Sequence, residues 1–132
     1  MTATATTNAT LLREGYDAFA QGDLDKVRSM FDPKIVWHEP GHSDIDGDYE
    51  GVDAVFDFFG KLFEETDGTF KAEPVDILAD DDRGVVLQHV TATRHGKTMD
   101  VTFPVVWEIR DGKPYDVRVY LYDLEEHDQF WS

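Results

Sequence analysis

Four strand-length segments separated by short turns make up most of the second half of this 132-residue chain. They are rich in β-branched and aromatic residues and cover 70–78, 85–94, 98–110 and 114–123. The last turn contains Asp111-Gly112, a pair typical of tight hairpins because both residues tolerate positive φ angles. Strands that follow one another through such short turns pair as neighbours, so the sequence predicts an antiparallel meander.

The first half of the chain shows helical periodicity instead. Apolar residues recur at three- and four-residue spacing over 9–21, and Gly22 ends this predicted helix. Asp23 is a good N-cap for a second, short helix, which stops at Asp32-Pro33. A third helix with a wide apolar stripe follows Gly51.

A single strand, KIVWHE at 34–39, lies between the second and third helices and is ended by Pro40-Gly41. Helices segregated from a run of strands predict an α+β domain whose sheet wraps against its helices. We expect residues 1–8 to be disordered or loosely ordered and residues 9–132 to form a single domain, which suits the length. The polar start has neither the basic nor the apolar segment of a secretory signal.

Composition and charge exclude several kinds of site. The chain has no cysteine, which rules out disulfides, thiolate nucleophiles and cysteine-based zinc sites. No apolar run approaches the ~18 residues of a membrane span, and we expect a cytoplasmic protein. The formal charge of −16 repels phosphate backbones, so nucleic acid is not an expected partner. Because the acids are spread along the chain, they indicate a solvated acidic surface, as in adaptation to high salt, rather than a site for a cationic partner.

Residues 38–42 read HEPGH and satisfy the H-E-x-x-H pattern of zinc metalloproteases. That motif needs both histidines on one helical face, but Pro40 costs a helix about 3 kcal/mol and the preceding residues favour a strand. In a strand, His38 and Glu39 point to opposite faces. With no obvious third ligand beside His38 and His42, we predict neither a zinc protease nor any metal site. The loop DIDGDYE at 44–50 lacks the spacing of a calcium loop and is predicted to be a solvated turn.

Two segments, YDAFAQGDLDKVRSMFDPKIVWHEPG and RVYLYD, carry a family resemblance. With the helix and meander between them, they make the chain resemble the SnoaL-like branch of the ketosteroid isomerase and nuclear transport factor two superfamily. The resemblance implies a cone-shaped, cystatin-like roll in which three helices pack on a strongly curved, mostly antiparallel sheet. That roll encloses an apolar pocket and commonly forms a homodimer. Members include cofactor-independent isomerases, polyketide cyclases and epoxide hydrolases, and also non-enzymatic binding domains.

The resemblance singles out Glu39 as the best candidate catalytic residue, because ketosteroid isomerases carry their general base just before a proline on the first strand. Burial of a carboxylate in an apolar pocket raises its pKa, which suits a base near neutral pH. The two oxyanion donors of those enzymes align near Gly15 and Val106 and are therefore missing. Tyr16 is one residue away, about 100° around the helix. His38 faces the other side of its strand, where a structural hydrogen bond is as plausible as a role at a ligand.

The catalytic positions of the related epoxide hydrolases and cyclases hold His89, Thr91 and Tyr120 in this chain, so the carboxylates of those enzymes are not retained. His89 and Tyr120 are candidate catalytic donors to developing negative charge, and Thr91 is a candidate ligand contact. Arg118 alternates onto the same face of the last strand as Tyr120. If that face is concave, Arg118 would hold an anionic ligand or pair with Glu39; if it is convex, the face would form a dimer interface.

Aromatic side chains are expected to build the core and the pocket wall. The residues predicted to contact a ligand are Tyr16, Trp37, His38, Phe56, Phe59, Thr91, Phe103, Trp107 and Arg118. Two hypotheses for the function remain open. The first is a cofactor-independent isomerase, cyclase or hydrolase that acts on a small, largely apolar molecule, with Glu39 as the base. The second is a non-catalytic ligand-binding or dimerisation domain.

Overall fold

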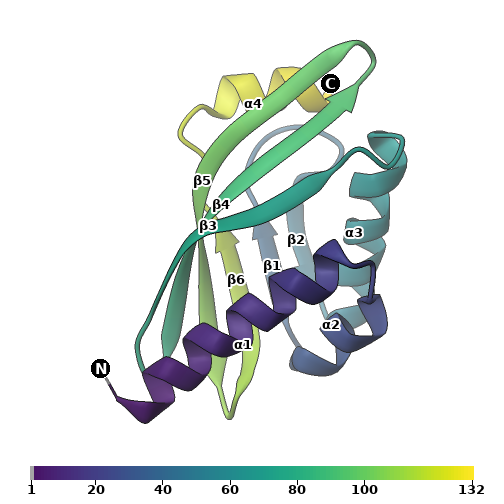
Figure 1. Ribbon diagram of the computed structural model, residues 1–132. Coiled ribbons are helices and arrows are strands. Elements are labelled where there is room, and N and C mark those ends of the chain that lie inside the picture. Colours follow the sequence, from purple (N-terminus) through teal and green to yellow (C-terminus); the bar gives the residue numbers. More distant parts are fainter. Residues whose placement is uncertain (1) are drawn as a thin grey trace.

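The computed structural model describes residues 2–132, which form four helices and one six-stranded sheet (Figure 1). The elements, in chain order, are α1 (Ala3–Ala20), α2 (Leu24–Met30), β1 (Val36–Glu39), β2 (Gly47–Glu50), α3 (Val52–Glu65), β3 (Lys71–Ala79), β4 (Arg83–Arg94), β5 (Lys97–Arg110), β6 (Lys113–Val119) and α4 (Leu124–Trp131). The strands lie in the order β2-β1-β6-β5-β4-β3, and every pair is antiparallel except β1 with β6. The α+β class and the meander predicted from sequence are confirmed.

The first helix begins at Ala3 rather than at the predicted Ala9. Thr2 caps it, because its side chain accepts a hydrogen bond from the Ala5 N–H at 3.0 Å. Asn8 is buried and donates to the backbone carbonyls of Asp80 and Asp81 in the turn between β3 and β4. Residues 3–8, expected to be loosely ordered, are therefore helical, and a contact distant in sequence fixes them.

Two further elements differ from the sequence prediction. The last strand, predicted to reach residue 123, ends at Val119, and Asp123 instead N-caps α4 by accepting from the Glu126 N–H. The loop before α3 contains β2, which pairs with β1 through Trp37 opposite Tyr49. Part of the segment predicted as a solvated turn is thus a strand, because it has a sheet edge to pair with.

Curvature of the sheet creates a concave side that faces α1, α2 and α3 (Figure 1). Register shifts bend it between Pro74 and Asp76 in β3 and between Glu108 and Ile109 in β5. Apolar residues that alternate along the long strands point to the concave side and form the core, among them Val86, Val90, Phe103, Val105 and Trp107. The short helix α4 lies beside β5, away from α1. None of the described helices is both long and apolar enough to cross a membrane.

Candidate functional site

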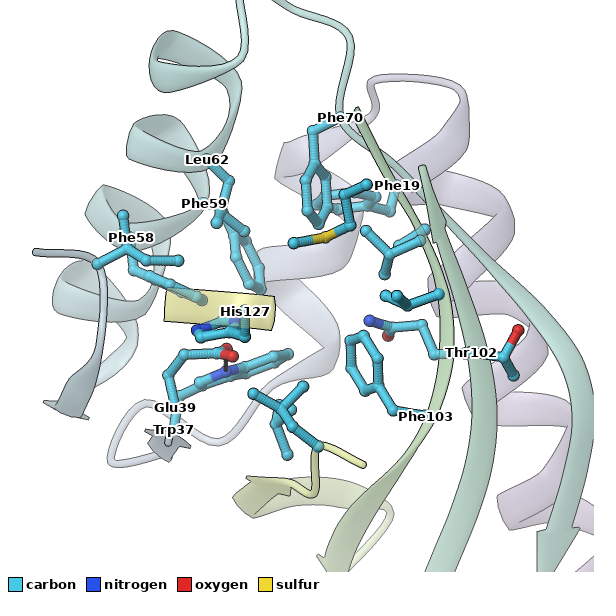
Figure 2. Close-up of a pocket in the computed structure, with 18 of the residues that line it drawn as sticks. Phe19, Trp37, Glu39, Phe58, Phe59, Leu62, Phe70, Thr102, Phe103 and His127 are labelled. Carbon is cyan, nitrogen blue, oxygen red and sulfur yellow. Dashed lines mark hydrogen bonds between the residues drawn. The ribbon is translucent and has the colours of Figure 1, made fainter. Parts of the chain in front are cut away.

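A cavity of about 500 Å³ lies between the concave side of the sheet and the helices. Its wall is mostly aromatic and aliphatic, and α4 contributes to it through His127, Phe130 and Trp131. Figure 2 shows Trp37, Glu39 and His127 on one side of this pocket and Phe103 on the opposite side. Its volume falls within the usual range for small-molecule sites, which are typically apolar with a few placed polar groups.

Glu39 lies at the end of β1 and is one of three acidic residues that line the pocket, with Asp123 and Glu126. Trp37 lies two residues earlier on the same strand face, and its indole Nε1 donates to Glu39 Oε1 at 3.1 Å. Burial raises the pKa of Glu39 to about 7; the Trp37 hydrogen bond and the His127 imidazole oppose this rise, while the charge of Asp46 adds to it. Near neutral pH the carboxyl group is therefore present in both protonation states, as a proton-transferring group must be.

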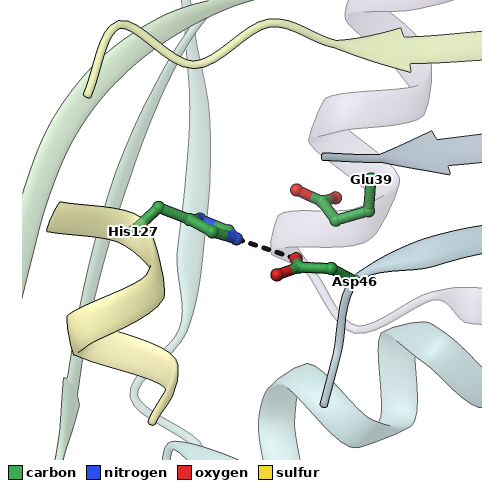
Figure 3. Close-up of side chains that lie close together, drawn as sticks. All are labelled: Glu39, Asp46 and His127. Atoms are coloured by element: carbon green, nitrogen blue, oxygen red, sulfur yellow. Dashed lines mark hydrogen bonds and ion pairs between the residues drawn. The ribbon is translucent and has the colours of Figure 1, made fainter. Parts of the chain in front are cut away.

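A buried histidine–aspartate pair lies next to Glu39 (Figure 3). The Nε2 of His127, on α4, donates to Asp46 Oδ1 at 2.8 Å, and the two side chains are 7% and 3% exposed. The other oxygen of Asp46 accepts from the backbone N–H and hydroxyl of Ser43 at 2.8 and 2.6 Å. One polar atom from each of Glu39, Asp46 and His127 lies within 4.8 Å of the other two. The three side chains come from β1, the loop before β2, and α4.

The Pro40-Gly41 turn explains why the HEPGH segment has no protease geometry. His38 and Glu39 belong to β1, and His38 binds Asp48 and Asp116 on the face away from the pocket. Gly41 has a φ angle of 127°, and any Cβ there would collide with the Asp46 carboxylate. Glycine therefore allows the chain to turn closely around Asp46.

A second polar pair belongs to the same pocket. The hydroxyl group of Tyr16, on α1, donates to Gln88 Oε1, on β4, at 2.6 Å, and both residues are buried. Burial raises the pKa of Tyr16 above its usual range, and the neighbouring Trp107 indole opposes this rise only in part. Tyr16 thus stays protonated and continues to donate.

The structure brings together about half of the residues that the sequence suggested. The pocket wall contains Tyr16, Trp37, Glu39, Phe59, Phe103 and Trp107. Phe56 packs behind this wall, against the rings of Phe31 and Phe59.

The remaining suggested residues lie on the outer face of the sheet. Within β4 the residues Val86, Gln88 and Val90 point inward, so alternation places His89 and Thr91 outside, where His89 binds Asp100 at 2.7 Å. Arg118, on β6, is exposed and contacts Asp116, and Tyr120, in the segment that follows β6, is 51% exposed. The geometry therefore does not bring His89, Thr91, Arg118 or Tyr120 to Glu39, and it places His38 on the outer face with them.

The sequence interpretation missed the pocket residues His127 and Gln88, and it missed Asp46, the buried partner of His127. His127 lies three and four residues before Phe130 and Trp131, so the three side chains share one face of α4. This spacing in the sequence could have indicated that His127 is buried together with the two aromatic residues. Asp46 lies in a loop of acids that gave no sign of burial. Only the alternation of side chains along β4 bears on the position of Gln88, and the sequence does not show which face of that strand points into the pocket.

Comparison with known proteins agrees with this architecture. The SnoaL-like domain family matches residues 12–117 of the chain. The structure of Bal32a, from a soil-derived mobile gene cassette, is 42% identical and superposes with a TM-score of 0.94, covering 98% of this chain and 99% of that one. A Xanthomonas campestris protein described as having a cystatin-like fold is 26% identical, with a TM-score of 0.86 over 95% of this chain and 98% of its own.

A more distant structure shares the fold alone. TerC, co-crystallised with polyporic acid, is 20% identical with a TM-score of 0.81, covering 94% of this chain and 97% of TerC. The cystatin-like roll implied by the sequence resemblance is thus confirmed. On the strength of the domain match and of the 42% identity to Bal32a over nearly the whole length of both chains, this protein belongs to the SnoaL-like family.

Proposed function

We propose that this protein binds a small, largely apolar organic molecule in the pocket and catalyses a cofactor-independent proton transfer on it. Glu39 would act as the base and then as the acid. The reaction class would be an isomerisation or cyclisation of a molecule with an acidic C–H bond next to a carbonyl group. Membership of the SnoaL-like family supports a ligand-binding or isomerase/cyclase role in general terms, and TerC, a protein of the same fold, has been co-crystallised with polyporic acid.

The observation that carries the proposal is the position of Glu39 in an apolar wall, beside a buried His127–Asp46 pair. An apolar pocket strengthens a base toward a C–H proton because it removes the water that stabilises the carboxylate. Asp46 fixes the orientation of the imidazole, since Ser43 holds one of its oxygens while the other accepts from His127. The imidazole in turn lies close enough to lower the pKa of Glu39.

The proposed step moves one proton in each direction. The Glu39 carboxylate takes the proton from the carbon next to the carbonyl, and the electron pair of the broken C–H bond moves into the carbonyl to give an enolate. In a substrate with a carbon–carbon double bond between the β and γ carbons, this enolate is a dienolate. The protonated Glu39 then returns the proton to the γ carbon, which regenerates the carbonyl and the carboxylate and moves the double bond into conjugation with the carbonyl. The His127–Asp46 pair remains beside Glu39 through both steps, where His127 lowers the pKa of Glu39 and the charge of Asp46 raises it.

The test is deuterium uptake by a simple carbon acid, 2-tetralone, in D₂O. We expect the protein to accelerate exchange of the protons between the ring and the carbonyl, as followed by NMR, and Glu39→Gln to abolish the acceleration. Glu126→Gln is the matched control, because Glu126 is an exposed carboxylate at the same pocket. Exchange at the uncatalysed rate in the presence of demonstrated 2-tetralone binding would reject catalysis and leave a non-catalytic ligand-binding domain as the function.

A further inference from the structure

The pocket meets solvent on the side of the molecule where α4 lies. Within residues 2–132, no exposed residue of the pocket lining comes from α1, α2, α3 or β1. The exposed residues of the lining all belong to α4, to the two residues before it, or to β5: Thr98, Thr102, Tyr122, Asp123, Glu126 and Gln129. A ligand therefore reaches the pocket past α4.

The buried face of α4 borders the cavity instead of a filled core. His127, Phe130 and Trp131 are the buried residues of this helix, and all three line the pocket. A side chain that faces a cavity lacks contact atoms on that side, so it gains less dispersion energy than a side chain in a filled core. Lifting α4 therefore costs less free energy than lifting a helix that packs on a filled core, and it opens the pocket.

Polar contacts hold α4 on two sides. On one side, two cations of the β4–β5 hairpin donate to its last carbonyl groups. On the other side, the loop after β1 provides two contacts: His127 donates to Asp46 at 2.8 Å, and Asp128 accepts from the backbone N–H of His42 at 2.9 Å. Water can replace each of these bonds at a small net cost, so the contacts can open and close again.

The segment between β6 and α4 is suited to act as a hinge. The N–H of Tyr120 donates to the Pro104 carbonyl at 3.0 Å. Beyond it, the N–H groups of residues 121–123 have no hydrogen-bond partner among residues 2–132, and Tyr122 is 78% exposed. Hinges are usually a few such residues at the end of an element, where the backbone angles can change without breaking other contacts.

We propose that α4 is a lid that turns about residues 121–123 to admit the ligand and, on closing, brings His127 to Asp46 beside Glu39 (Figure 3). The loop that carries the HEPGH segment is the latch of this lid. A Cβ at Gly41 would meet the carboxylates of both Asp46 and Asp128, so glycine allows the close contact. Control of access does not depend on the chemistry, whereas assembly of the acid–base cluster on closure rests on the proposed function.

An engineered disulfide can lock the lid, because the chain has no cysteine of its own. His42→Cys combined with Asp128→Cys joins the latch to α4 at a place where the Asp128 carboxylate already contacts residue 42. Arg83→Cys combined with Glu108→Cys is the control. These two residues lie directly opposite each other in β4 and β5, in an exposed ion pair away from α4.

Tryptophan fluorescence measures access to the pocket. The three tryptophans of the chain, Trp37, Trp107 and Trp131, all line the pocket and are 6%, 6% and 4% exposed. The rate constant for quenching by acrylamide is obtained from fluorescence lifetimes for each variant, oxidised and reduced. We expect oxidation of the 42/128 variant to lower this constant by about threefold or more and oxidation of the control to leave it unchanged. Equal constants in the two redox states of the 42/128 variant would overturn the lid.

A second variant needs no disulfide. Asp128→Ala removes the contact with the His42 backbone, and we expect it to raise the quenching constant by about twofold or more because the lid opens more often. Glu125→Ala is its control, since Glu125 is an exposed carboxylate of the same helix whose partner is Gln129, within α4. A quenching constant for Asp128→Ala equal to that of the unmodified protein would contradict the role of the latch.

Deuterium uptake by 2-tetralone separates this inference from the proposed function. The oxidised 42/128 variant should lose the acceleration of exchange, and reduction should restore it. If the unmodified protein does not accelerate exchange, the proposed function fails, while slower quenching in the oxidised variant still supports the lid. If exchange is accelerated equally in the oxidised and reduced variant, the ligand does not enter past α4, and the inference fails while the proposed function stands.

Discussion

Glu39 has one polar neighbour that is close in the sequence and one that is distant. Trp37 is adjacent in the strand and donates a hydrogen bond that stabilises the carboxylate, whereas His127 arrives on the last helix. Burial nevertheless dominates, and the pKa of Glu39 rises to about 7. A single neutral-donor hydrogen bond cannot replace the hydration that a carboxylate loses in an apolar wall. The residue is thus a destabilising group when it is ionised.

This destabilisation predicts how the free energy of unfolding depends on pH. The Glu39 carboxyl binds its proton more tightly in the folded protein, with a pKa of about 7, than in the unfolded chain at 4.5. Its contribution to stability is therefore fully present below 4.5 and is lost as the pH rises through about 7. Glu39→Gln cannot ionise, so at pH about 8 we expect it to be more stable than the unmodified protein by roughly 1–3 kcal/mol. Below pH about 5 the two proteins should converge.

Urea unfolding at several pH values between about 5 and about 8 measures this difference. Glu126→Gln serves as the control, because it removes one exposed carboxylate by the same substitution and leaves Glu39 in place. Parallel profiles for Glu39→Gln and the unmodified protein would show that Glu39 titrates normally in the folded state.

The last helix completes the pocket, although it is too short to be stable alone. The eight residues of α4 provide His127, Phe130 and Trp131 to the cavity wall. Its C-terminal end is held by two cations of the β4–β5 hairpin. Arg94 donates to the carbonyls of Phe130 and Ser132, and Lys97 donates to Gln129 and Ser132. Positive charge at this end also matches the helix dipole.

Removing Arg94 should therefore loosen α4 and, with it, the pocket. Arg94 also binds Glu65 of α3 at 3.1 Å, with only 10% of its side chain exposed, so Arg94→Met leaves this carboxylate without its partner. We expect a loss of about 1–3 kcal/mol in unfolding free energy and faster hydrogen exchange in residues 124–131. Exchange is followed by mass spectrometry, with Arg83→Met as the control, because Arg83 forms an exposed ion pair with Glu108 away from α4. Unchanged exchange in α4 would mean that packing of Phe130 and Trp131 alone holds the helix.

At the scale of the whole protein, charge opposes folding. The chain carries 28 acidic and 12 basic residues, and most of the acids lie on the surface. Bringing them together in a compact fold costs electrostatic free energy, which dissolved salt screens. The core, which includes Phe58, Ile35 and Val55, does not depend on that screening.

We therefore expect added salt to stabilise this protein. Raising KCl from about 0.05 M to about 1 M shortens the screening length to ~3 Å and should increase Tm by several degrees. About 1 kcal/mol of relieved repulsion corresponds to roughly 4 °C for a domain of this size. Calorimetry in KCl and in an osmotically matched sucrose solution separates screening from preferential exclusion. A Tm that stays constant or falls in KCl would show that the surface acids do not repel one another appreciably.

Local sequence determined most of the secondary structure, and together with the family resemblance it predicted half of the suggested site residues correctly, Glu39 among them. Periodicity and turn residues predicted α1 to α3, the meander and the strand that contains Glu39, because these features depend on neighbours only a few positions apart. The same reasoning rejected the helical metal motif at 38–42, since Pro40 and a strand-forming segment are incompatible with it. The secondary structure at the two ends of the chain was predicted poorly, because α4 and the start of α1 are stabilised by contacts with residues distant in the sequence.

Tertiary structure alone decided which side of the sheet is the inside. Both faces of β4 carry apolar residues, so alternation grouped His89 with Thr91 and Gln88 with Val90 without showing which group meets the helices. In the folded protein the sheet curves so that Gln88 and Val90 face the helices, and His89 lies on the outer face. The His127–Asp46 hydrogen bond joins residues 81 positions apart, and it forms only because α4 folds back beside β5. No local pattern encodes such a contact, since it depends on where the completed sheet and helices leave space to be filled.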